Sequence, residues 1–164
     1  MQMNRRYLLG AGGAGLLGGV FFFGQRESRA AEGKFEIMLS DAEWRKRLTP
    51  QQYAVLRKEN TEEPGSSLLN KEKRKGTYVC AGCGLPLYSS ATKFESGTGW
   101  PSFWKPLPNA IATREDNKLF FTRTEVHCRR CGSHIGHVFD DGPKPTGKRY
   151  CNNGVALKFI AEGT

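Results

Sequence analysis

The chain has 164 residues, 38% of them hydrophobic, which is enough for one domain with a modest core. Its 20 glycines and 8 prolines favour a turn-rich β architecture over a helical bundle. The formal net charge is +9, and residues 1–30 carry +3 of it. The remaining +6 is compatible with a nucleic acid or an anionic surface as a partner, but is specific to neither.

Residues 1–30 have the pattern of an export signal. Arg5 and Arg6 closely precede an uncharged, glycine-rich stretch at 8–24, which is typical of a twin-arginine leader. Small residues at its end predict cleavage there, which leaves a domain at 31–164. We expect a protein exported to the periplasm; if the leader is not cleaved, it would instead anchor the chain in the membrane.

Two short helices are predicted after the leader. Ser40 with Glu43, and Thr49 with Gln52, each form a capping-box pattern, in which an N-cap hydroxyl is followed three residues later by Glu or Gln. Pro50 fits the first position of the second helix. Helix starts are therefore expected near residues 40 and 49.

From residue 77 onward, short apolar runs alternate with turn residues, which is typical of antiparallel strands. The expected strands are 77–79, 85–88, 119–123, 135–139 and 155–160. The predicted fold is mainly β, with the two short helices packed on an antiparallel core.

Four of the five cysteines form two Cys-x-x-Cys pairs: Cys80 with Cys83, and Cys128 with Cys131. This spacing, in turns that contain glycine, is that of zinc knuckles, and two knuckles supply four thiolates to one tetrahedral ion. We therefore expect one structural zinc ion. In an oxidising compartment, the same cysteines could instead form disulfides.

Cys151 is the fifth cysteine, and it lies in a segment that has the residues of a reactive site. If this segment is extended, Arg149, Cys151 and Asn153 share one face. A positive charge near a thiol favours the thiolate, and an asparagine can orient a substrate. His134 and His137 are the best general-acid candidates, because imidazole titrates near neutrality and four cysteines already satisfy the metal. Taken alone, Cys151 could equally be a small buried hydrophobe.

A glycine-rich loop at 96–104 contains Trp100 and Phe103, with Pro101 between them to stiffen it. Aromatic residues of this kind fill a core by default. In a loop, however, they more often line a site, so Trp100 and Phe103 are candidate substrate-binding residues.

Three motifs together resemble the peptide-methionine (R)-S-oxide reductase family, MsrB. They are Gly-Trp-Pro-Ser-Phe at 99–103, Ser-His-Ile-Gly-His-Val-Phe-Asp-Asp-Gly-Pro at 133–143 and Arg-Tyr-Cys-Asn-Asn at 149–153, and both knuckles accompany them. The resemblance covers about residues 35–160 and implies a β-rich fold of two small antiparallel sheets.

The resemblance also implies a role for each matching residue. The nucleophile would be Cys151, the acids His134 and His137, the aromatic wall Trp100, the positioning residues Arg149 and Asn153, and the zinc ligands the four knuckle cysteines. The implied reaction is the reduction of methionine (R)-sulfoxide. The thiol attacks the electrophilic sulfur, an imidazolium protonates the oxygen, and a cysteine sulfenic acid remains.

One position departs from the family pattern. Many members have a resolving cysteine where this chain has Thr98. The other four cysteines are assigned to metal, so we expect an external thiol, such as a thioredoxin-like domain or a small dithiol, to reduce the sulfenic acid on Cys151. The expected substrate is an oxidised protein or peptide.

Two other functions compete with this one. A zinc-ribbon module could use its basic surface on nucleic acid, an idea best supported by Arg129 and Arg130 between two knuckle cysteines. A zinc enzyme acting on aldehydes or similar substrates would need an open metal, which four thiolate ligands argue against. We expect no nucleic-acid partner, membrane contact only through the leader, and a monomer.

Overall fold

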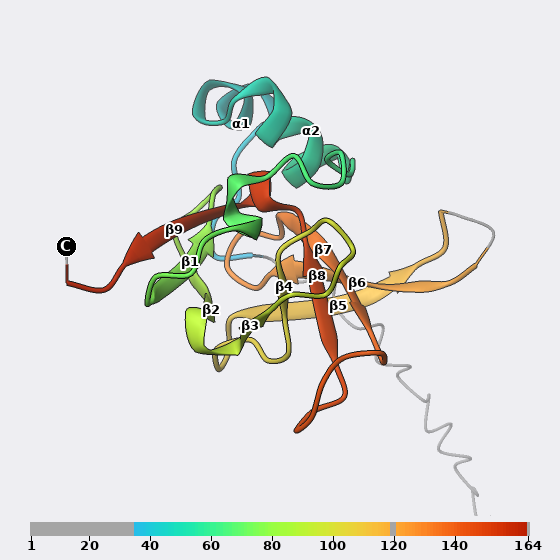
Figure 1. Ribbon diagram of the computed structural model, residues 1–164. Helices are drawn as coiled ribbons and strands as arrows, with labels where there is room; N and C mark the ends of the chain where they lie inside the picture. Colours follow the sequence, from blue (N-terminus) through green and yellow to red (C-terminus); the bar gives the residue numbers. More distant parts are fainter. Residues whose placement is uncertain (1–34, 119–120, 164) are drawn as a thin grey trace, which may run out of the picture. The chain divides into compact units, whose positions relative to one another are not determined.

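The computed structural model describes residues 35–118 and 121–163 (Figure 1). The predicted export signal lies outside the described residues. Within the described ranges, no helix combines the length and the apolar character needed to cross a bilayer.

Both predicted helices are present, and both begin with the expected capping box. In α1 (Asp41–Arg47) and α2 (Pro50–Lys58), the N-cap hydroxyl accepts a hydrogen bond from the third backbone N–H, and the third side chain bonds back to the N-cap. Glu59 ends α2 with a left-handed φ of 58°. The helices bury Trp44 and Leu56, which are 2% and 1% exposed.

The strands form two antiparallel sheets, as predicted. The three-stranded sheet has the order β2-β1-β9. Its strands are β1 (Gly76–Cys80), β2 (Pro86–Ser89) and β9 (Leu157–Ala161). Figure 1 shows it beside the larger sheet, with α1 and α2 together on one side of the strands.

The six-stranded sheet has the order β3-β4-β8-β7-β6-β5. Its strands are β3 (Lys93–Phe94), β4 (Ser102–Phe103), β5 (Ile111–Asp116), β6 (Arg123–Cys128), β7 (His134–Phe139) and β8 (Arg149–Asn152). Three short 3-10 helices connect elements: η1 (Leu68–Asn70), η2 (Ser90–Thr92) and η3 (Gly154–Ala156). This sheet carries most of the residues singled out in the sequence.

The strand predicted at 119–123 is displaced. Residues 119 and 120 lie outside the described range, and β6 begins only at Arg123. Three further strands were not predicted at all: the polar strand β5 and the short strands β3 and β4. In β5, three consecutive residues are exposed before a buried Asp116, so this strand lacks the apolar run by which the others were recognised.

One core joins the two sheets and the helices. Tyr78 of β1 packs edge-on against Phe103 of β4 at 4.9 Å between ring centroids, and Tyr88 of β2 stacks on the same ring at 4.4 Å. The three rings are fully buried. They fix β4, and with it the segment before β4, relative to the smaller sheet.

Candidate functional site

Cys151 lies on β8 in the interior of the six-stranded sheet. It pairs with Ser102 of β4 on one side and with His137 of β7 on the other. Side chains of directly paired residues project from the same face of a sheet. The strand register therefore places the Cys151 thiol and the His137 imidazole on one face.

His134 reaches this face through a β-bulge. Residues three apart in an unbroken strand point to opposite faces. Between β6 and β7, however, Val126 pairs with Gly136 and the next residue, His127, pairs with His134, so one residue of β7 is extra. The rings of His134 and His137 consequently meet edge-on, with centroids 5.3 Å apart.

A cavity of about 120 Å³ lies beside Cys151. Its lining includes Trp100, Arg123, His137, Phe139, Cys151 and Asn153. Drug-sized ligand sites measure roughly 300–1,000 Å³, so this cavity suits a single side chain rather than a large cofactor.

Trp100 is held as a wall of this cavity. Its indole Nε1 donates a hydrogen bond of 3.1 Å to the carbonyl of Glu62. The preceding Gly99 has a φ of +91°, and a Cβ added there would lie 2.8 Å from Pro64 Cβ. The backbone N–H of Gly65 donates to the Gly99 carbonyl at 2.7 Å. The close approach of these two segments requires glycine and fixes the indole.

Arg149 and Asn153 lie on either side of Cys151 and are both held in place. Arg149 donates two hydrogen bonds of 2.8 Å to Asp141, and its guanidinium lies 4.4 Å from the centroid of the Phe139 ring. Asn153 lines the cavity but is 3% exposed, and its amide bonds the backbone of Glu62 and the carbonyl of Ile135. Phe103, in contrast, is a core residue away from the cavity lining.

The site holds a protonated thiol and a neutral imidazole at neutral pH. Burial raises the pKa of Cys151, and the hydrogen bond to Thr98 and the charge of Arg149 oppose this only in part. Burial lowers the pKa of His137, against the opposing effect of its hydrogen bond to Asp116. Both shifts move the group away from its charged form.

The four knuckle cysteines form a cluster between the two sheets. Their sulfur atoms all lie within 4.8 Å of one another, with Cys80 Sγ 3.8 Å from Cys131 Sγ and Cys83 Sγ 3.5 Å from Cys128 Sγ. Four sulfurs bound tetrahedrally at about 2.3 Å would be roughly 3.8 Å apart, so the donor set fits one closed metal site. All five cysteines are free thiols in the structure, so the disulfide alternative is absent from it.

Comparison with known proteins decides the family. The SelR domain model matches residues 48–161. Peptide methionine sulfoxide reductase MsrB of Leifsonia xyli is 53% identical over 81% of this chain and 97% of the relative. The proteins of the same name from Methanosarcina barkeri and Leptospira interrogans are 57% and 50% identical, over 75% and 78% of this chain and 87% and 98% of theirs.

This chain belongs to the MsrB family. The resemblance inferred from the sequence motifs is thereby confirmed. Among solved structures, the Mis18 'Yippee-like' domain is 16% identical, with a TM-score of 0.43 over 56% of this chain and all of the other, which is too distant to support any conclusion.

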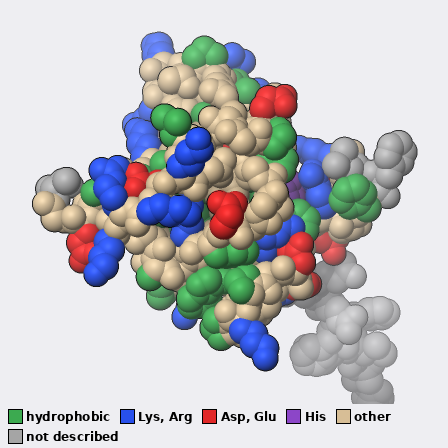
Figure 2. Space-filling model, in the orientation of Figure 1, with side chains coloured by type: hydrophobic (Ala, Val, Ile, Leu, Met, Phe, Trp, Pro, Cys, Tyr) green, Lys and Arg blue, Asp and Glu red, His purple; other side chains and the backbone are tan. Residues whose placement is uncertain are grey.

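The surface of this MsrB chain bears on the nucleic-acid alternative. Arg129 and Arg130, its best support in the sequence, both form ion pairs with Glu36, at 3.3 and 3.5 Å. On the face seen in Figure 2, Lys and Arg side chains are interspersed with acidic ones rather than gathered in one basic stripe. The visible charge pattern is that of a mixed, solvated surface.

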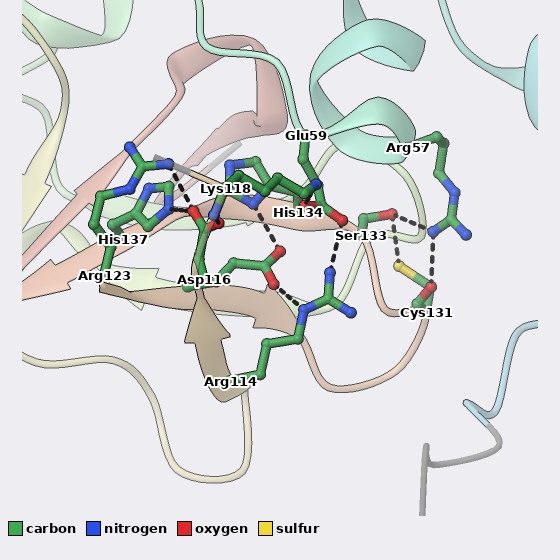
Figure 3. Close-up of polar contacts among 11 residues, drawn as sticks. Arg57, Glu59, Arg114, Asp116, Lys118, Arg123, Cys131, Ser133, His134 and His137 are labelled. Atoms are coloured by element: carbon green, nitrogen blue, oxygen red, sulfur yellow. Dashed lines mark hydrogen bonds and ion pairs between the residues drawn. The ribbon is translucent and has the colours of Figure 1, made fainter. Parts of the chain in front are cut away.

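Two carboxylates that contact the histidines were not predicted from the sequence. They are Asp116 of β5 and Glu125 of β6, and Figure 3 shows Asp116 beside His137 and Arg123. His137 Nε2 lies 2.7 Å from Asp116 Oδ2, and His134 Nδ1 lies 2.8 Å from Glu125 Oε1. For Glu125, the available signal was the alternation Arg123-x-Glu125 within a strand, because a period of two places both side chains on one face.

Proposed function

We propose that this protein reduces methionine (R)-sulfoxide to methionine with Cys151 as the nucleophile. One observation carries the proposal: Cys151 and His137, paired across β7 and β8, line the same small cavity as Trp100. A soft nucleophile, a proton carrier and an apolar wall are what the reduction of a sulfoxide requires.

The protonation states define the first step. As the Cys151 thiol gives its proton to the neutral ring of His137, its sulfur attacks the sulfoxide, and the imidazolium then protonates the departing oxygen. The sulfoxide S–O bond breaks, and the oxygen and the thiol proton end on Cys151 as a sulfenic acid. The sulfoxide gains two electrons and the thiol loses them, so no other reactant is needed.

Trp100 supplies substrate orientation. Its indole, fixed by the hydrogen bond to Glu62, offers an apolar face to the S-methyl group of the substrate. The S–O bond then points toward His137. In a chiral cavity, only one sulfoxide epimer satisfies both contacts, and family membership assigns the R epimer.

The sulfenic acid is reduced by an external thiol. Thr98, which takes the place of the resolving cysteine found in many relatives, offers no sulfur, and the other four cysteines form the cluster at the sheet junction. Cys151 is partly exposed, so a thioredoxin-like partner or a small dithiol can reach it. We propose methionine sulfoxide in proteins or peptides as the substrate.

The cysteine cluster holds one structural zinc ion. Cys80 ends β1 of the smaller sheet and Cys128 ends β6 of the larger one, so an ion bound to both joins the sheets. Four thiolates leave no open position, and the zinc therefore stabilises the fold and takes no part in the reaction.

The protein acts after export to the periplasm. Support comes from the sequence alone: the paired Arg5 and Arg6 precede the glycine-rich stretch of the predicted leader. Replacing both by lysine should block export and leave the precursor in the cytoplasm. Unchanged export and maturation of that variant would contradict the twin-arginine assignment.

The deciding experiment is a stereospecific assay. Peptides containing R- or S-sulfoxide are incubated with the protein and dithiothreitol, and zinc is quantified on the same sample. We expect turnover of the R peptide alone and one zinc per chain. Equal turnover of both epimers, or no turnover by the zinc-loaded protein, would contradict the proposed function.

A further inference from the structure

The two histidines are held through opposite ring nitrogens. His137 uses Nε2 to contact Asp116, whereas His134 uses Nδ1 to contact Glu125. An ionised carboxylate only accepts hydrogen bonds, so each contacting nitrogen carries a proton. In a neutral ring, the other nitrogen is then the acceptor: Nδ1 in His137 and Nε2 in His134.

The strand register builds this arrangement into the sheet. Arg114 of β5 pairs with Glu125 of β6, Glu125 with His137 of β7, and His137 with Cys151 of β8. This is one cross-strand row on a single face. Asp116 lies two residues from Arg114 and therefore on the same face.

Cations keep both carboxylates ionised. Arg123 donates to Asp116 Oδ2 at 2.6 Å (Figure 3), and the backbone N–H of Lys118 donates to its Oδ1 at 3.1 Å. Arg114 forms an ion pair with Glu125. Burial alone would raise the pKa of both carboxyl groups. The hydrogen bonds from the histidines and arginines outweigh it, so both pKa values are lowered.

The second ring nitrogen of His134, Nε2, is buried next to the His137 ring. The ring is 2% exposed, and its Nε2 is a buried nitrogen with no hydrogen-bond partner among the described residues. Because Nδ1 contacts Glu125, this nitrogen is the acceptor of the neutral ring, and it belongs to a ring whose centroid lies 5.3 Å from that of His137.

We infer that Asp116 and Glu125 are positioning residues: each fixes the tautomer of one histidine, and the tautomer of His137 is the one that transfer of the thiol proton needs. The inference rests on the proposed function. With Nε2–H held by Asp116, His137 presents its Nδ1 lone pair as the only ring site able to take the thiol proton. In the opposite tautomer, Nδ1 would already carry a proton, and Cys151 would have no acceptor.

The variants Asp116→Asn and Glu125→Gln test this, because an amide is the same size as the carboxyl group but can also donate to the ring. The control is Glu115→Gln, which removes an equal charge from an exposed residue on the opposite face of β5. Zinc content and thermal unfolding verify that each variant is folded.

Two readouts separate positioning from a structural contribution. Nitrogen-15 NMR of the imidazoles should show wild-type His137 protonated at Nε2 and His134 at Nδ1, with the assigned tautomer lost in the matching variant. The kcat for R-sulfoxide peptide should fall about 10–100-fold with KM little changed, the size of the effect known for lost partners of metal-bound histidines. Asp116→Asn should be the more severe, since His137 lines the cavity and His134 does not.

The outcomes distinguish this inference from the proposed function. Folded variants that keep wild-type tautomers, or that keep wild-type kcat while the wild type reduces R-sulfoxide, would overturn the positioning role and leave the function standing. Absence of turnover in the wild type would instead refute the function, and the NMR result would still decide whether the carboxylates fix the tautomers.

Discussion

Thr98 places its hydroxyl oxygen 3.9 Å from the sulfur of Cys151. The hydroxyl is itself held 2.8 Å from Ser96 Oγ, which lies 2.8 Å from Ser102 Oγ, so the loop is fixed at this distance. The position to which the family resemblance assigns a resolving cysteine in many members is therefore next to the proposed nucleophile in this chain.

Thr98→Cys should convert the protein to internal resolution. After one turnover without reductant, the new thiol attacks the sulfenic acid and forms a disulfide with Cys151, because the two side chains are already in contact. Intact-mass spectrometry should show a loss of two hydrogens in this variant, and an added oxygen in the wild type.

The matched control is Thr98→Ser, which keeps the hydroxyl and adds no sulfur. It should accumulate the sulfenic acid like the wild type. A Cys151 disulfide in the wild type after turnover would contradict external resolution.

The reactivity of Cys151 should increase with pH in the free protein. The thiolate is the reactive form, and burial raises its pKa, so the rate of alkylation by iodoacetamide should rise with a midpoint above the ordinary value of about 8.5. Arg149→Met removes a charge that lowers this pKa, so its midpoint should move further up. Peptide mapping measures the alkylation at Cys151 alone.

Lys148→Met is the control for Arg149→Met. Lys148 is an exposed neighbouring cation whose charge is paired with that of Asp140. Its midpoint should match that of the wild type. A wild-type midpoint below the ordinary value would contradict the effect of burial on the pKa of Cys151. Equal midpoints for both variants would contradict the effect of the Arg149 charge.

Removing one cluster cysteine should release the proposed zinc ion and destabilise the fold. Cys131→Ser leaves three thiolates between the sheets, and we expect the free energy of unfolding to fall by roughly 5 kcal/mol or more. Metal analysis and thermal unfolding measure both effects. Cys151→Ser should keep its zinc and its melting temperature while losing turnover. A zinc-free Cys151→Ser protein would contradict the assignment of four cysteines to the metal and of Cys151 to the reaction.

Features coded within a few residues could be predicted from the sequence. The capping boxes at Ser40 and Thr49 start their helices where expected, because all their hydrogen bonds join residues three apart. The Cys-x-x-Cys pairs and the segment around Cys151 are local in the same sense. Their spacing alone defines which groups share a turn or a face.

Features that depend on pairing between distant strands could not be predicted. His134 and His137 have a spacing that places them on opposite faces of a regular strand, and only the bulge opposite His127 returns them to one face. Asp116 shows no special pattern in its own exposed strand, and becomes significant only when β6 and β7 are aligned beside it. Burial likewise depends on distant strands: Phe103, an aromatic residue of the loop motif, lies in the core.

Gly136 should be intolerant of even a methyl group, because β7 and β8 approach closely beneath the nucleophile. A Cβ at Gly136 would lie 2.0 Å from the carbonyl oxygen of Cys151, a backbone atom that cannot rotate away. Gly136→Ala must therefore push the strands apart and disturb the pairing of His137 with Cys151. We expect a loss of about 1–3 kcal/mol in the free energy of unfolding, and at least a tenfold loss in kcat/KM while the protein is still folded.

Val126→Ala is a control that separates the loss of stability from the loss of the β7–β8 geometry. Val126 is fully buried on β6, so its truncation destabilises the same sheet through a cavity, without forcing β7 and β8 apart. Denaturant unfolding and steady-state kinetics are compared at a temperature where both variants are folded. If strand separation is the cause, Gly136→Ala loses far more activity than Val126→Ala at similar stability; equal losses would show that the close approach matters only for the fold.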